Sequence, residues 1–369
     1  MVVRGLNSAG LFTADAATFV ITEVTENLTL QISVENDTGI LTSFTEMYSP
    51  DEHNTVTLYG LHELARTYIT MPNLLPAATL EGVSVDIAVD FLQDGEWASL
   101  FSQKFYYCRQ RLIGLDGSYS GFLSRYKNRK VRDNQPVHCA FLDHGQTLQM
   151  AVAYRTADKA KYAVVDIATL ESTGNMAIYD VSPAMAVKYL ASMAGISLAE
   201  KDVIYVNAIL RNADGAMIDR IHHEVDHRYF TQQTVMSFYN LFGAPDSLVL
   251  TGKFEQESEM TATYGTINGQ YLKLDTRLGD KYTANTGYLE PAAQGAARDL
   301  VSSSEVRLVR EGELQEVVTV TEMTAVTVRP STEPTNFKIT YKLADGGENA
   351  FSRDTDIRIF DKTFDYTFD

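Results

Sequence analysis

The sequence predicts a mainly β protein of two or three sandwich- or barrel-like domains with a few short helices. Over much of the chain Thr, Val and Ile alternate with polar residues, as they do in strands with one solvated face. Turn-forming pairs recur between these stretches at the spacing typical of sandwiches and barrels. A length of 369 residues exceeds one ordinary core, so more than one domain is expected.

The strand candidates run from one end of the chain to the other. Residues 18–34 alternate β-branched and polar side chains, and residues 82–108 predict a hairpin because Asp94 and Gly95 form a typical two-residue turn. Further strand candidates lie at residues 147–156, 161–170, 305–330, 337–347 and 357–369.

Three short helices interrupt the strands. Residues 60–69 place Leu61, Leu64, Ala65 and Tyr68 on one face, which predicts an amphipathic helix. A third helix is expected within residues 290–303.

The second helix, within residues 182–195, has clear end signals. Ser182 is a candidate N-cap, Pro183 suits the first helical position, and Gly195 is a typical stop. We interpret its stripe of Met and Tyr side chains as core packing: Met185, Tyr189 and Met193.

We place the domains at residues 1–115 (a β domain with a short helix), 116–235 (an α+β domain) and 236–369 (a β domain). The boundaries are soft, because no low-complexity linker separates them. Residues 114–136, rich in glycine and then in basic residues, are the best candidate for a boundary loop.

The composition excludes several classes of function. A net charge of −17 argues against DNA, RNA or an anionic membrane as the main partner. No apolar run approaches the ~20 residues of a membrane span, and residues 1–19 do not resemble a signal peptide. Two cysteines, Cys108 and Cys139, make no disulfide framework and favour folding in a reducing compartment.

One motif suggests catalysis. His223, Glu224 and His227 spell H-E-x-x-H, the zinc-protease pattern, which needs a helix because only there do both imidazoles reach one ion. On a strand the two Cα atoms would be about 13 Å apart.

The surrounding residues favour a strand. Asn212 to Gly215 is typical of a hairpin turn, so residues 216–225 should pair with residues 203–210, although a helix from Ala216 stays open. In that case the histidines lie on a polar strand face or edge, and we expect no bound metal.

Two charged runs have two interpretations each. Glu255, Glu257 and Glu259 alternate along one face. They form either a carboxylate cluster for cation binding or glycoside hydrolysis or, as we favour, a solvated strand face or a salt-bridged subunit contact. The basic run Arg125–Arg132 either docks an acidic neighbour, such as another copy of this chain, or is a solvated loop.

From Phe238 onward the chain resembles a family of tail-associated structural proteins of Bacteroidetes phages and prophages. The family pattern has an aromatic-Asn-x-x-Gly loop, an Asp, a strand ending near Thr-Gly, a long polar hairpin, an N-T-G step and a S-x-E-V strand. The matching positions here are Asn240, Gly243, Asp246, Thr251, Gly252, Asn285 to Gly287 and Ser304 to Val306. The resemblance covers roughly the last third of the chain and implies no catalytic residues.

The resemblance implies a distal-tail or baseplate-like ring subunit of a virion tail, assembled in the bacterial cytoplasm. We therefore expect a non-catalytic protein without cofactors, in contact with copies of itself and other tail proteins. A host-surface glycan would be reached through a neighbouring adhesin. One alternative is a carbohydrate-binding adhesin, because the chain has 20 Tyr and 17 Phe that could stack on sugars. The other is a zinc hydrolase that uses His223, Glu224 and His227.

Overall fold

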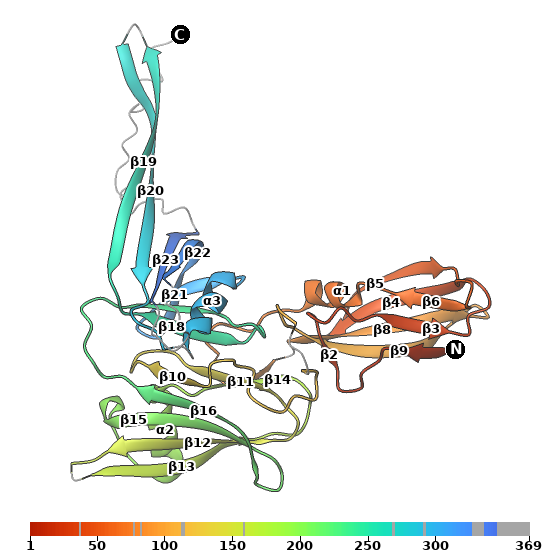
Figure 1. Cartoon of the computed structure of the whole chain (residues 1–369), viewed down its shortest axis with the longest axis horizontal. Helices are drawn as coiled ribbons and strands as arrows, with labels where there is room; N and C mark the ends of the chain where they lie inside the picture. Colours follow the sequence, from red (N-terminus) through yellow and green to blue (C-terminus); the bar gives the residue numbers. More distant parts are fainter. Residues whose placement is uncertain are drawn as a thin grey trace, which may run out of the picture.

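A computed structural model describes residues 1–36, 38–76, 78–81, 83–111, 115–157, 159–267, 270–290, 293–326 and 336–344. The chain is mainly β, with several separate sheets and three α-helices among these residues, which confirms the predicted fold class (Figure 1). The strand expected at residues 357–369 lies outside the described residues.

The N-terminal part pairs a five-stranded sheet with a three-stranded one. The larger sheet has the order β2 (Leu11–Phe12), β9 (Glu96–Tyr106), β8 (Ser84–Gln93), β4 (Leu28–Asn36), β5 (Gly39–Tyr48). The smaller has the order β1 (Val2–Arg4), β3 (Phe19–Thr22), β6 (Thr55–Leu58).

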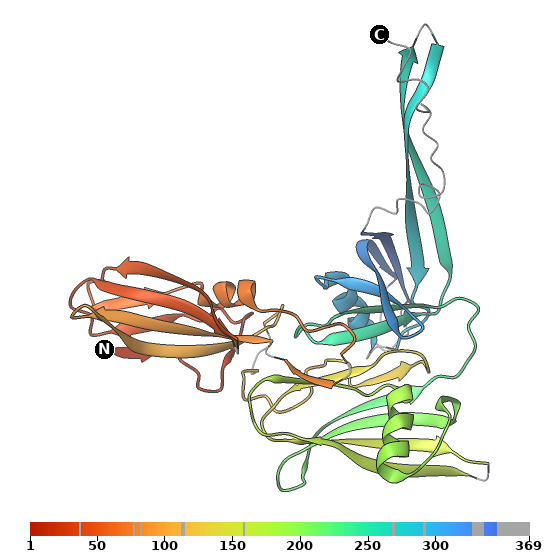
Figure 2. The ribbon, with the colours of Figure 1, turned by 180° about the vertical axis from the view of Figure 1, so that it is seen from behind.

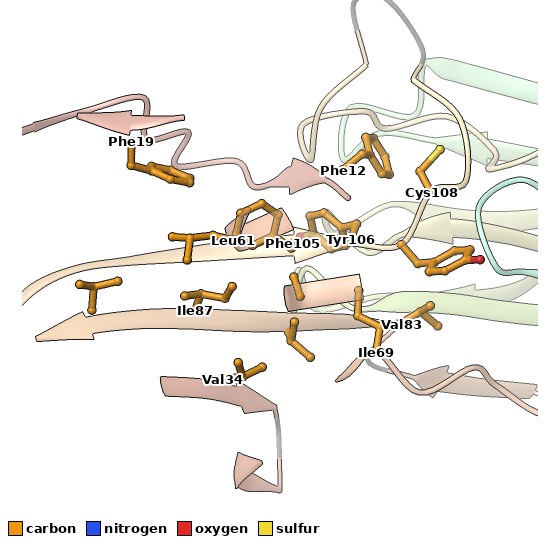
Figure 3. Close-up of a cluster of buried hydrophobic side chains, with 14 of the residues drawn as sticks. Phe12, Phe19, Val34, Leu61, Ile69, Val83, Ile87, Phe105, Tyr106 and Cys108 are labelled. Atoms are coloured by element: carbon orange, nitrogen blue, oxygen red, sulfur yellow. The ribbon is translucent and has the colours of Figure 1, made fainter. Parts of the chain in front are cut away.

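The core of this part is fully apolar at its centre. Phe19, Ile87 and Phe105 are completely buried, and Figure 3 shows them together with Leu61 from α1 (Leu61–Tyr68). The predicted hairpin and the first helix are both confirmed. Asp94 and Gly95 have φ values of 53° and 85°, as a two-residue turn between twisted strands requires.

The middle part has two sheets and one helix. Its five-stranded sheet has the order β10 (Asn128–Val131), β16 (Met217–Val225), β15 (Val203–Arg211), β12 (Thr147–Arg155), β13 (Ala160–Thr169). Its three-stranded sheet has the order β11 (His138–Leu142), β14 (Met176–Asp180), β7 (Ala78–Glu81). The strand β7 belongs by sequence to residues 1–115, but it pairs with β14 of the middle part. The domain boundaries therefore stay predictions.

Helix α2 (Pro183–Ala194) lies across the five-stranded sheet (Figure 2) and is followed by the short 3-10 helix η1 (Glu200–Asp202). Its predicted ends are confirmed: Met185 N donates to the Ser182 side chain at 3.3 Å, and Gly195 is left-handed. The prediction that Met185, Tyr189 and Met193 pack in the core is wrong for Met193. The helix buries Pro183, Ala186 and Leu190, whereas Met193 is 50% exposed.

The C-terminal part is one seven-stranded sheet packed with α3 (Gln294–Ser302), within the range predicted for a third helix. Its order is β18 (Pro245–Leu250), β17 (Thr234–Tyr239), β21 (Val306–Arg310), β22 (Glu313–Val326), β23 (Asn336–Leu343), β20 (Gln270–Asn285), β19 (Phe254–Ile267). β18 and β19, the two ends of this order, are joined by only three residues, and Gly252 N donates to Asn285 O at 2.9 Å. The sheet therefore curls round a core that contains Phe238, Phe337 and Ile339.

Candidate functional site

The H-E-x-x-H motif lies on a strand, as the hairpin turn predicted. Gly215 has a φ of 79° and its N–H donates to Asn212 O at 2.9 Å, and β16 returns along β15 from Met217 to Val225. The prediction of a strand edge was wrong, because β10 covers the other side of β16 in parallel. His223 lies on β16 and His227 lies beyond its end at Val225, so the two imidazoles do not share the helical face that would bring both to one zinc ion.

The three histidines of this stretch have separate environments. His223 is 1% exposed, and neither ring nitrogen has a hydrogen-bond partner among the described residues. His222 Nδ1 lies 2.7 Å from Asn207 Oδ1 on β15. His227, beyond the strand, has Nε2 2.6 Å from Val203 O and Nδ1 2.7 Å from Asp133 Oδ1. No group of three or more His, Cys, Asp or Glu side chains suited to a metal occurs in the described part of the chain.

Burial and the neighbouring Arg129 both lower the pKa of His223. The two residues are register partners on β10 and β16. Burial lowers the pKa of His223 well below its usual 6.5, and the charge of Arg129 lowers it further. His223 is therefore neutral at physiological pH.

Arg129 also forms a buried ion pair with the C-terminal sheet. Its Nη1 lies 2.7 Å from Asp246 Oδ1, with 5% and 4% of the two side chains exposed, and 3.3 Å from Ser247 O. Gln135 Nε2 donates to Ser247 O at 3.2 Å and to Ser247 Oγ at 3.0 Å. These contacts join β10 and the segment after it to β18 through polar groups that are almost fully buried.

Three further cations of the basic run are also paired within the chain. Lys127 lies 2.5 Å from Asp219, Lys130 lies 3.2 Å from Glu290, and Arg132 lies 3.5 Å from Asp226. Part of the predicted boundary loop is thus the strand β10, and the solvated-loop interpretation was wrong for Arg129, which is buried on that strand. Docking on an acidic neighbour would have to compete with these internal pairs.

The first positions that carry the family resemblance form a tight loop between β17 and β18. Asn240 Oδ1 accepts from Phe242 N at 2.9 Å and from Ala244 N at 3.2 Å, while its Nδ2 donates to Leu123 O at 3.0 Å. Gly243 is left-handed with a φ of 76°. The loop inserts Phe242 into the N-terminal core, so it links that core to the C-terminal sheet.

The later positions are also structural. Asn285 Oδ1 accepts from Gly287 N at 2.8 Å, and its side chain packs against Gly252, where a Cβ would lie 2.7 Å from Asn285 Oδ1. Thr251 Oγ1 donates to Thr286 O at 3.3 Å. The strand β21 begins at Val306, at the end of the S-x-E-V step. These residues fix where β18 turns into β19.

The strands β19 and β20 continue beyond the sheet as a two-stranded arm. The register pairs Glu257 with Lys281 and Ile267 with Gln270, whereas β23 pairs only with Tyr282–Asn285 of β20. About eleven residue pairs thus project without a third described strand, roughly 35 Å at the usual strand rise. Figure 1 shows this arm extending away from the rest of the chain.

The arm has an aromatic pair near its tip. Tyr264 and Tyr271 stack with ring centroids 5.4 Å apart and an interplanar angle of 8°, and they are 49% and 74% exposed. At its base, Glu255 lies 2.5 Å from Lys253 and 3.6 Å from Lys338, and these lysines lower its pKa. Glu257 is exposed, which agrees with the favoured solvated strand face; nothing is described for the Glu259 side chain.

A cavity of about 460 Å³ opens beside the base of the arm. Phe254, Tyr282 and Tyr341 from three adjacent strands line one side of it, and Leu308 of β21 lines the other. Sequence analysis missed this site. Phe254 and Tyr282 meet through the pairing of β19 with β20, and Tyr341 joins them only because β23 pairs with β20, a contact that no local sequence pattern predicts.

The comparisons with known proteins do not assign the chain to a family. No family model matches it, and neither does any curated protein. Native alpha-2-macroglobulin from Escherichia coli, spanning domains MG0-NIE-MG1, aligns with 85% of this chain and 95% of its own at 11% identity and a TM-score of 0.21. A tetra-tandem repeat from the extending region of a large adhesion protein aligns with 92% of this chain and 87% of its own at 10% identity and a TM-score of 0.21. Both similarities are too low to inform fold or function.

Both cysteines are free and buried, and burial raises the pKa of Cys108 to about 11 and that of Cys139 further. These thiols are therefore protonated and unreactive at neutral pH. No helix of the described residues is long and apolar enough to cross a membrane.

Proposed function

We propose that this chain is a non-catalytic structural subunit of a phage tail or a related tail-like assembly, of the ring-forming distal-tail or baseplate type. The single observation that carries the proposal is the projecting arm. A two-stranded ribbon is marginally stable alone in water, since most of its backbone edge and both faces stay solvated. An arm of this length is therefore best explained by contact with another subunit.

The arm has the chemistry of an assembly contact. Among the described residues it offers strand edges that no third strand covers, exposed Met260 and the stacked pair Tyr264 and Tyr271, and aromatic and Met side chains are enriched at protein interfaces. The body that carries it is stiffened by the buried pair Arg129–Asp246 and by the Asn240 loop. Such a body suits a subunit that must hold its arm in a fixed direction round a symmetry axis.

The proposal includes the partners and the place of action. The arm contacts copies of this chain or other tail proteins, and the protein joins a virion tail after folding in the bacterial cytoplasm. Neither nucleic acid nor membrane is a partner, because the net charge of −17 repels both.

Imaging purified particles and placing the chain in the density tests the proposal. We expect a ring of copies with each arm seated on a neighbour. A shortened arm sharpens the test: residues 259–279 are replaced by Asn-Gly between Ser258 and Asp280, which face each other in the register. This variant should keep the melting temperature of the body and fail to enter particles.

The matched control is Tyr229→Ser, which changes a residue that is 86% exposed but lies outside the arm. It should enter particles normally. Absence of the native chain from purified particles, or normal entry of the shortened arm, would remove the proposal.

A further inference from the structure

The cavity at the base of the arm has a flat aromatic side. Tyr282 and Tyr341 are direct cross-strand partners, with ring centroids 5.4 Å apart and an interplanar angle of 21°. Phe254 lies 6.1 Å from Tyr282 at 30°. Three rings thus form a row across β19, β20 and β23, and all three residues line the cavity.

The Tyr341 hydroxyl is the most informative polar group of this cavity. Its residue is only 2% exposed, and it lines the cavity. Burial raises the pKa of this phenol to about 12, so it is a protonated donor at neutral pH. A protonated hydroxyl on the wall of a cavity can donate a hydrogen bond to a ligand that enters it.

The opposite rim supplies planar polar groups. Arg310 and Glu316 line the cavity, and both are close to its tyrosines. The charge of Glu316 raises the pKa of Tyr282 and of Tyr341, and the charge of Arg310 lowers both. Gln232 and Gln233 also line the cavity, where Gln232 Oε1 accepts from Phe254 N at 3.1 Å and Gln233 Nε2 donates to Asn134 Oδ1 at 3.4 Å. Planar amide, carboxylate and guanidinium groups can each bond two adjacent hydroxyls of one ligand.

We propose that this cavity binds a neutral carbohydrate of one to two sugar rings, with a ring face stacked on the row Phe254–Tyr282–Tyr341 and its hydroxyls bonded at the rim. A volume of about 460 Å³ lies in the range of small-ligand sites. Sugar rings offer both an apolar face for aromatic stacking and many hydroxyls. The acidic chain and the rim glutamates Glu311 and Glu316 disfavour a carboxylate-bearing sugar.

An array of neutral and carboxylate-bearing oligosaccharides tests this with the full chain, followed by calorimetric titration of the neutral oligosaccharide with the highest signal. We expect Tyr282→Ala to weaken binding roughly tenfold or more, since one stacking contact is removed. Tyr282→Phe keeps the ring and should bind within about twofold of the native chain. Tyr288→Ala is the control, because Tyr288 is 81% exposed and does not line the cavity.

Circular dichroism of each variant separates lost binding from lost folding. If Tyr282→Ala unfolds, Tyr341→Phe replaces it, and a loss of affinity with the fold intact supports the proposal. No binding of any neutral oligosaccharide at millimolar concentration would overturn it, as would a preference for acidic sugars. If the chain binds no sugar but self-associates, and Tyr282→Ala abolishes that association, the proposal is wrong and the cavity is instead a contact site for a second copy of the chain. None of these outcomes depends on the presence of the chain in a tail.

Discussion

Arg129 and Asp246 form a buried ion pair 2.7 Å long that joins the middle sheet to the C-terminal sheet. Removing one partner of such a pair leaves a charge without compensation, at a cost of about 3–5 kcal/mol. We expect Asp246→Asn and Arg129→Met each to lower the free energy of unfolding by that order, measured by urea denaturation.

The control for the ion pair is Lys130→Ala. Lys130 and its partner Glu290 are 44% and 56% exposed, and exposed pairs contribute little. Equal effects of the Lys130 and Asp246 variants would contradict a special role for the buried pair.

His223 should make stability depend on pH. Its folded pKa lies well below 6.5, because burial, then Arg129 and His222, disfavour its charged form. The unfolded chain takes up this proton near pH 6.5 and the folded chain does not, so stability falls as pH drops below about 6.5. The slope is up to about 1.4 kcal/mol per pH unit for one proton.

We therefore expect His223→Gln to flatten the fall in stability between pH 7 and pH 5.5, measured by denaturation at each pH. His138, whose pKa burial also lowers, should keep part of the slope. The control is His53→Gln at a side chain that is 78% exposed. An unchanged slope in His223→Gln would refute the assignment.

Gly215→Val should destabilise the chain by roughly 1–3 kcal/mol, because a β-branched residue is strained at a φ of 79°. No atom lies within 4 Å of a Cβ at this position, so the cost comes from the backbone alone. Gly279 is similarly open but is not left-handed, and Gly279→Val is the matched control. Similar melting temperatures of the two variants would show that the turn does not need glycine.

Purified protein should carry no zinc. The strand β16 directs His223 into the core and Glu224 to the opposite face, while His227 is bonded to Val203 O and Asp133. Elemental analysis checks this directly. About one zinc per chain, lost in His227→Ala, would reverse the conclusion.

The tip of the arm should matter for assembly and little for folding. Tyr264 and Tyr271 are exposed and belong to none of the buried clusters among the described residues. We expect Tyr264→Ser with Tyr271→Ser to leave the melting temperature nearly unchanged and to reduce entry into particles, measured by quantitative mass spectrometry. Tyr288→Ser is the control, and equal entry of both variants would exclude the pair from the contact.

The sequence by itself determined the features that depend on a few neighbouring residues. Alternation predicted the β class, Asp94–Gly95 and Asn212–Gly215 predicted two turns, and Ser182 with Gly195 predicted both ends of α2. Backbone conformation at a turn or cap is set by side chains within a few positions, which is why these predictions are confirmed.

The tertiary structure alone decided what those elements contact. Arg129 lies in a basic run whose composition is typical of a surface loop, yet its side chain is buried against Ser247, 118 positions later. Tyr282 and Tyr341 form one side of a cavity because their strands pair, although the two residues are 59 positions apart in the chain. Partner choice over such distances depends on which sheets pack together, and the free energy of that packing is summed over the whole core rather than encoded in any single motif.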